Sequence, residues 1–62
     1  MIALAIENRM SALITTTSQT VEALVTRNGN PVVTKYFDTE AQAVDFVEQF
    51  HPTSIEFETL DI

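Results

Sequence analysis

The side chain best suited to proton transfer near neutral pH is His51, the only histidine in the chain. Asp45 and Glu48 precede it by one or two helical turns, so a histidine–carboxylate base could form there. No nucleophile accompanies that pair, because the serines lie in neither a nucleophile elbow nor a triad signature. A histidine at the end of a helix also interacts favourably with the helix dipole. We therefore predict no catalytic residue and no enzymatic activity.

The acidic residues near the C-terminus are the candidates for a cation site. Glu56, Glu58 and Asp61 are closely spaced, but calcium loops place their acids on a turn that contains glycine. This stretch instead alternates with apolar residues, as a strand does. One His and no Cys leave no ligand set for zinc, and the single Gly29 is needed in a turn rather than in a phosphate-binding loop. We expect no metal and no cofactor.

The charge is unevenly distributed along the 62 residues, whose net charge is −6. All three basic residues lie within the first 35 positions, whereas the chain from Asp38 onward holds seven acidic residues and no Lys or Arg. Phosphates require Lys and Arg, so direct nucleic-acid binding is disfavoured. An acidic surface instead fits the basic surface of another protein, although acids can also serve only to keep a small protein soluble. The predicted acidic partner-binding face consists of Asp45, Glu48, Glu56, Glu58 and Asp61.

The clearest local structural signal is Asn28-Gly29, which lies between the apolar stretches 20–26 and 31–37. Asn-Gly supplies the two positive φ angles of a type I′ turn, so these stretches are predicted to form a β-hairpin. A regular register places Leu24 opposite Val33 and pairs Glu22 with Lys35 across the strands. Pro31 lacks an N–H group, which predicts that its strand begins at a sheet edge.

A third strand is predicted over residues 11–17, before this hairpin. A two-residue turn at Ser18-Gln19 then puts Leu13 opposite Leu24 and Ile14 opposite Ala23. One face of this meander is expected to be a core face, made of Ala12, Ile14, Val21, Ala23, Val25, Val32 and Tyr36. The other is expected to carry Leu13, Glu22, Leu24, Val33, Lys35 and Phe37.

A helix is predicted after the hairpin. Asp38 or Thr39 can cap it, and Gln42 stands at the capping-box spacing from Thr39. Pro52 disfavours helical geometry at the preceding residue, so the helix should end near Phe50 after about 12 residues. Its apolar stripe, with helical spacing, is Ala43, Val44, Phe46, Val47 and Phe50.

The last segment, residues 53–62, alternates like a half-buried strand. Ile55 and Phe57 share one side, and Glu56 and Glu58 point outward about 6.6–6.8 Å apart. This strand runs parallel to strand 11–17, beside which we expect it to pair. Residues 1–10 fit either a strand or a helix, with a slight preference for a strand.

The sequence thus predicts a single α+β domain over residues 1–62, with element order β-β-β-α-β and a possible extra N-terminal strand. The helix packs on one face of a three- to four-stranded sheet. The other face carries an apolar stripe. On so small a domain we expect this stripe either to be covered or to serve as a contact surface. That stripe could be covered by the N-terminal segment, by a second copy or by another protein; its residues are Leu13, Leu24, Val33 and Phe37.

Two stretches resemble small acidic phage-encoded inhibitor proteins. The pattern Asn28-Gly29-x-x-Val32-x-x-Lys35-x-Phe37-Asp38-Thr39-Glu40, followed by Phe46 and Pro52, is similar to a hairpin-into-helix stretch of an anti-CRISPR family that inhibits a type I-F surveillance complex. Phe50-His51-Pro52 with Ile55-Glu56-Phe57-Glu58 resembles the RNA-polymerase inhibitors of T7-like phages. The anti-CRISPR family continues into another helix where this chain is expected to form a strand. The resemblance implies a class of activity and assigns no residue.

From these observations we expect a non-enzymatic inhibitor that binds the basic surface of a host nucleic-acid-handling complex and is encoded by a phage or mobile element. The alternative is a homodimeric assembly module built on the apolar stripe. The longest apolar run is 2–6, which is too short for a membrane span or a signal peptide, so a soluble cytoplasmic protein is expected. In a phage-encoded protein this compartment is the host cytoplasm.

Overall fold

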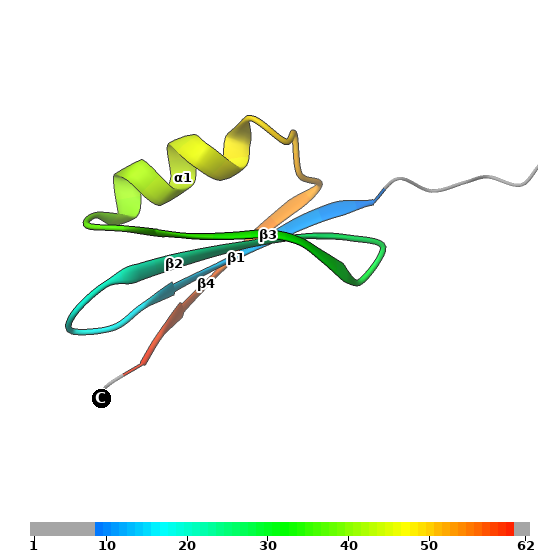
Figure 1. Ribbon diagram of the computed structural model, residues 1–62. Coiled ribbons are helices and arrows are strands. Elements are labelled where there is room, and N and C mark those ends of the chain that lie inside the picture. The colour runs from blue at the N-terminus through cyan, green and yellow to red at the C-terminus, as the bar shows by residue number, and fades with distance from the viewer. Residues whose placement is uncertain (1–8, 61–62) are drawn as a thin grey trace, which may run out of the picture.

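A computed structural model describes residues 9–60 as a four-stranded mixed sheet with one helix on one face (Figure 1). The strands lie side by side in the order β3-β2-β1-β4. This architecture confirms the predicted α+β class and the order β-β-β-α-β. The possible extra N-terminal strand falls on residues 1–8, outside the described range. The elements are β1 (Met10–Thr16), β2 (Val21–Arg27), β3 (Asn30–Phe37), α1 (Glu40–Glu48) and β4 (Ser54–Thr59).

The two turns of the β1-β2-β3 meander follow the sequence prediction. Asn28 has a φ of 52° and Gly29 a φ of 86°, as the two central positions of a type I′ turn require. The first turn spans two residues, since Leu13 stands opposite Leu24 in the β1–β2 pair. The Thr17 hydroxyl accepts the backbone N–H of Gln19 at 3.2 Å, which closes this turn locally.

The predicted β2–β3 register is wrong beyond the first two residue pairs. Thr26 stands opposite Pro31, but Val25 then pairs with Val33, so Val32 is the extra residue of a β-bulge. A proline near the start of an edge strand is a common place for such a bulge, because its missing N–H already interrupts the ladder. Every later residue of β3 therefore shifts to the opposite face of the sheet.

This shift exchanges the two faces of β3. Val33 and Phe37, predicted on the face opposite the helix, pack against the core instead. Val32 and Tyr36, predicted in the core, are 47% and 61% exposed. The bulge is favoured because it buries a phenylalanine ring and leaves the tyrosine hydroxyl in water. The Phe37 ring then lies 5.5 Å from the ring of Phe46 on α1.

The helix begins as predicted, at an N-cap with a capping box. Thr39 accepts the backbone N–H of Gln42 at 3.2 Å, and the Gln42 side chain accepts the backbone N–H of Thr39 at 3.2 Å. Regular helix ends at Glu48, two residues before the predicted end. The reason is a tightened last turn, in which Phe50 donates its N–H to the carbonyl oxygen of Val47, three residues back. His51 follows in the left-handed region with a φ of 51°.

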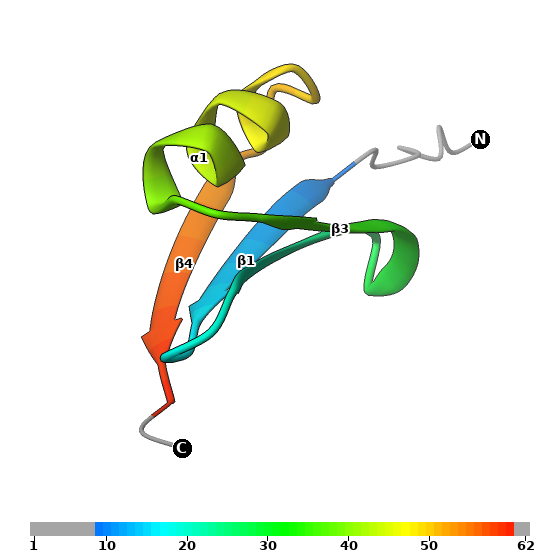
Figure 2. The ribbon, with the colours of Figure 1, turned by 60° about the vertical axis from the view of Figure 1, so that its left-hand side comes forward.

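The connection through α1 carries the chain from one edge of the sheet to the other. β3 and β4 are the two edge strands, and α1 packs against β1, β2 and β3 as it crosses between them (Figure 2). β4 then runs parallel to β1, as the sequence predicts, and Phe57 stands opposite Ile14. Among residues 9–60, no Cα atom of α1 lies within 8 Å of a Cα atom of β4, and Ile55 is the β4 side chain that packs against the core.

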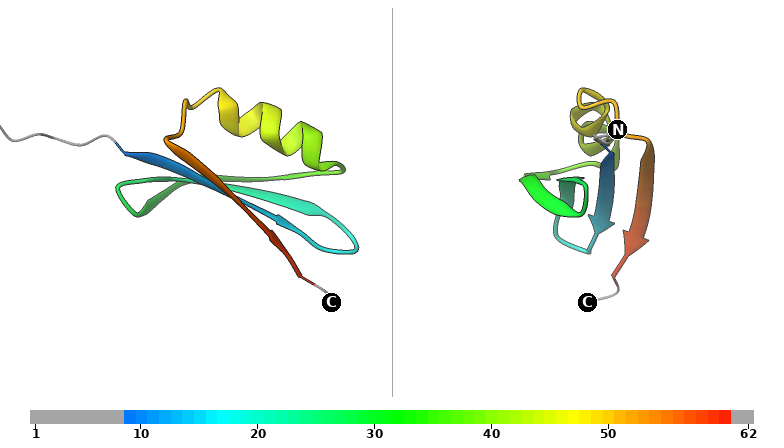
Figure 3. Two further views of the ribbon diagram at one scale, coloured as in Figure 1. Left: turned by 180° about the vertical axis from the view of Figure 1, so that it is seen from behind. Right: turned by 90° about the vertical axis from the view of Figure 1, so that its right-hand side faces the viewer.

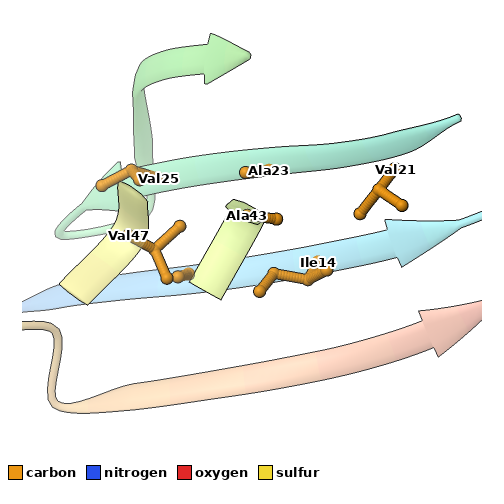
Figure 4. Close-up of a cluster of buried hydrophobic side chains, with 7 residues drawn as sticks. Ile14, Val21, Ala23, Val25, Ala43 and Val47 are labelled. Atoms are coloured by element: carbon orange, nitrogen blue, oxygen red, sulfur yellow. The ribbon is translucent and has the colours of Figure 1, made fainter. Parts of the chain in front are cut away.

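The buried core lies between α1 and the strands that it crosses (Figure 4). Its members are small or branched, which lets the helix lie close to the sheet. Met10, Val33, Val44 and the aromatic rings of the helix pack around them. The buried hydrophobic residues are Ala12, Ile14, Val21, Ala23, Val25, Ala43 and Val47.

Candidate protein-binding surface

The face of the sheet opposite α1 is covered by no element of residues 9–60 (Figure 3). We call it the open face. Successive residues of a strand point to opposite sides, so the register assigns its members directly. From β3 to β4 these are Thr34, Tyr36, Glu22, Leu24, Thr26, Ser11, Leu13, Thr15, Ser54, Glu56 and Glu58.

Three carboxylates lie on the open face. Glu22 and Glu58 flank Thr15 in one row across the sheet, and Glu56 stands beside Leu13 in the next row. The basic residues of the strands alternate with these positions and therefore lie on the helix side. The strand positions of the open face thus carry only negative formal charge.

Lys35 does not neutralise the acidic charge of the open face, because it lies on the other side of the sheet. Its ammonium nitrogen lies 5.8 Å from the ring centroid of Phe37 and 5.3 Å from that of Phe46, on the helix side. Lysine can place its stem along such apolar rings while its charge reaches water at the sheet edge. The predicted Glu22–Lys35 ion pair is therefore wrong, because the bulge puts the two residues on opposite faces.

Glu22 instead faces Tyr36 across the strands. The Tyr36 hydroxyl donates a hydrogen bond to Oε2 of Glu22 at 3.2 Å. This hydrogen bond, together with the negative charge of the carboxylate, raises the pKa of Tyr36 above its ordinary value. The pair joins an exposed aromatic ring and an acid at the β3 side of the open face.

The structure divides the predicted acidic face between two sides of the molecule. Glu56 and Glu58 are exposed on the open face, as the strand alternation predicts. Asp45 and Glu48 are also exposed, but they belong to α1 on the other side of the sheet. Asp61 lies outside the described residues. The four acids that the structure describes therefore lie on two opposite sides of the sheet.

The predicted apolar stripe is also divided. Leu13 and Leu24 stand opposite each other on the open face, and both are half-buried. Val33 and Phe37 are on the helix side, so the stripe is two residues wide rather than four. The same face also carries Glu22, as predicted, together with Tyr36 and Thr34. The sequence prediction missed Tyr36 and Thr34 as residues of this face. Placing Phe37 rather than Tyr36 in the core would have revealed the shifted register.

His51 and the acidic residues are the side chains that the sequence offers for proton transfer and for cation binding. His51 is exposed, and its backbone N–H donates to the carbonyl oxygen of Glu48 at 3.1 Å. Within residues 9–60, no three His, Asp or Glu side chains come together as a metal site would require. The described part of the chain also contains no helix that is long and apolar enough to span a membrane.

Comparison with protein-family models, with curated proteins and with solved structures finds no match to this chain. The surface itself is therefore the basis for an assignment of function.

Proposed function

We propose that this chain is a non-enzymatic protein-binding module whose open face contacts the basic surface of a partner protein. The observation that carries the proposal is the charge of that face: Glu22, Glu56 and Glu58 share it with no basic strand residue. Leu13 and Leu24 supply apolar contact between the acids. A face with a small apolar centre and a charged rim is typical of transient protein interfaces.

An inhibitory role follows from the kind of basic surface that such a face would cover. Lys and Arg clusters on proteins commonly hold nucleic-acid phosphates, and an acidic protein bound there competes with the nucleic acid. The phage-encoded inhibitors that the chain resembles are proteins of this class. We therefore propose that the partner is a nucleic-acid-handling complex, such as a CRISPR surveillance complex or an RNA polymerase.

The alternative, a homodimeric assembly module, rested on an apolar stripe of four residues. Val33 and Phe37 contribute to the core instead, and the remaining pair is half-buried and flanked by acids. Two copies that met through their open faces would bring like charges together, which opposes dimerisation. The basic-partner proposal is favoured for this reason.

The test compares two triple variants that remove the same charge from opposite sides of the sheet. Glu22→Gln/Glu56→Gln/Glu58→Gln neutralises the open face, and Asp38→Asn/Asp45→Asn/Glu48→Gln is the matched control. Each chain is immobilised, and partners from a host lysate are quantified by mass spectrometry at low and high salt. A genuine partner is lost with the first variant and at high salt, and is retained by the control. Three exposed ion pairs correspond to roughly a 3- to 150-fold change in affinity. Capture that ignores salt, or that the open-face variant retains, would refute the proposal.

A further inference from the structure

The outer edge of β4 is a free strand edge with regular geometry. Among residues 9–60 it pairs only with β1, and its register with β1 runs from Ser54 to Thr59 without interruption. Leu60 donates its N–H to the carbonyl oxygen of Thr16 at 2.8 Å. Backbone groups alternate in direction along a strand, so those of Ile55, Phe57 and Thr59 point away from β1. These groups form an unpaired row that another strand can bind.

The side chains of this edge differ on its two sides. Glu56 and Glu58 are exposed on the open face. On the helix side, Ile55 is half-buried and packs against the core, whereas Phe57 is 56% exposed. An exposed phenylalanine beside an unpaired strand edge offers apolar area that an added strand could cover.

We infer that β4 binds an extended segment of the partner by strand addition, and that this segment alternates basic and apolar residues. Each residue of an added strand lies on the same face as the residue opposite it. Lys or Arg would therefore stand on the open face opposite Glu56 and Glu58, and the intervening apolar residues would cover Phe57. This inference rests on the proposed function, for which it supplies the mode of contact.

A second copy of this chain is a poor occupant of the same edge. In a symmetric antiparallel β4–β4 pair whose helices lie on one side, the two-fold axis must pass through a residue position. If the axis passes through Glu56 or Glu58, that glutamate faces the same glutamate of the second copy. Centred on Phe57, each glutamate faces the other glutamate of the second copy. Every register with full overlap thus sets carboxylate directly opposite carboxylate, which is destabilising. The same acids that oppose self-pairing favour a basic strand.

The test uses three synthetic peptides of equal charge. The first alternates Lys and Val, the second has the same composition in two blocks, and the third is the alternating peptide with N-methyl groups on the backbone amides that would face β4. Binding is followed by amide NMR of the full chain, with hydrogen exchange measured at Ile55, Phe57 and Thr59. The matched variants are Glu56→Gln/Glu58→Gln and the control Asp38→Asn/Asp45→Asn.

We expect the alternating peptide to bind and to slow exchange at these three amides. The N-methylated peptide should bind roughly tenfold or more weakly, because it loses several backbone hydrogen bonds. The block peptide should also bind more weakly, because its sequence cannot place Lys opposite both Glu56 and Glu58 and Val beside Phe57 at the same time. Glu56→Gln/Glu58→Gln should lose binding, and the control should retain it.

Three results would overturn the inference. Equal binding of the block peptide, with shifts centred on Tyr36 and Leu24, would mean that basic segments bind the open face without strand addition; the proposed function would survive. Slow exchange at the three amides in the free protein would mean that the chain or a second copy already covers the edge. Absence of binding by all three peptides would exclude a basic strand as the occupant, and the lysate experiment would then judge the proposed function separately.

Discussion

The two edges of the sheet are built in opposite ways. β3 has Pro31 as its second residue, contains a bulge at Val32 and places the charged Lys35 on the helix side of the sheet. These are the features by which natural sheets prevent an edge from pairing with other strands. β4 contains no proline and no bulge, and its charges are acidic. The proline and the bulge disfavour the pairing of any further strand with β3. At β4 only the acidic side chains oppose pairing, and they oppose it only for strands that are themselves acidic.

The edges also differ in how they are attached to the rest of the fold. β3 is held to α1 by the contact between the rings of Phe37 and Phe46. The ring of Phe46 in turn makes an edge-to-face contact with that of Phe50, with a distance of 5.4 Å between ring centroids. β4 pairs with β1, and of its side chains only Ile55 packs against the core. At that turn Thr53 donates its N–H at 2.7 Å and its hydroxyl at 3.0 Å to the carbonyl oxygen of Met10. β3 therefore packs Val33 and Phe37 against the core, whereas β4 packs only Ile55 there.

The largest predicted effect is a difference in stability between two phenylalanine variants, one on each edge strand. Phe37→Ala removes a ring packed between the sheet and α1, and we expect it to lower the free energy of unfolding by about 2–4 kcal/mol. A domain of this size has roughly 3–9 kcal/mol in total, so this variant should be close to unfolding at 37 °C. Phe57→Ala, whose ring is 56% exposed, should cost about 1 kcal/mol or less. Urea unfolding followed by circular dichroism measures both. Equal costs would show that β4 is as much a part of the core as β3.

The second prediction concerns the acids that keep β4 from pairing with itself. Glu56→Gln/Glu58→Gln removes the opposed carboxylates, each pair of which is unfavourable by about 0.2–1 kcal/mol. The dimer dissociation constant should therefore fall roughly 2- to 30-fold. Sedimentation velocity across a concentration series measures it, with Asp38→Asn/Asp45→Asn as the control for lost charge. If both variants self-associate equally, net charge and not the β4 edge controls assembly.

The third prediction concerns the residues at the two ends of α1, which connects the edge strands β3 and β4. Thr39→Ala removes the hydroxyl that accepts the Gln42 N–H and should cost about 1 kcal/mol of stability. His51→Gly relieves a side chain held at a φ of 51° and should stabilise by about 1 kcal/mol. For a domain of this size either change shifts Tm by roughly 4–8 °C, in opposite directions. A loss of stability in His51→Gly would show that the imidazole makes a contact that outweighs the backbone strain.

The sequence predicted those parts of the fold that depend on local signals. The Asn28-Gly29 turn and the Thr39 cap each depend on residues close together in the sequence, and both are confirmed. The position of β4 beside β1 also followed, since Pro31 made the alternative edge unfavourable. The β3 register required a choice between burying Phe37 and burying Tyr36, which is a tertiary comparison that periodicity alone does not make.

The candidate surface was harder to predict for the same reason. The outward direction of Glu56 and Glu58 follows from alternation within one strand and is confirmed. Their separation from Asp45 and Glu48 depends on which side of the sheet the helix occupies. The exposure of Phe57 depends on how far α1 extends across the sheet, a distance that no local pattern encodes. The alternation of a strand predicted each side chain's direction, but not what covers it.

The smallest predicted effect is a change in the titration of Tyr36, the only tyrosine in a chain without tryptophan. The hydrogen bond to Glu22 and its negative charge raise the pKa of Tyr36, so Glu22→Gln should lower this pKa toward the ordinary value of about 10. Because the folded-state pKa lies above the unfolded one, the stability from this pair is present in full below pH about 10 and is lost as the pH rises through the folded value. Ultraviolet absorbance of the phenolate measures the pKa directly in both chains. Glu58→Gln is the control, since its carboxylate shares the open face without touching the hydroxyl. An unchanged Tyr36 pKa in Glu22→Gln would mean that the β3 edge holds its tyrosine away from the acid, as the register without a bulge would require.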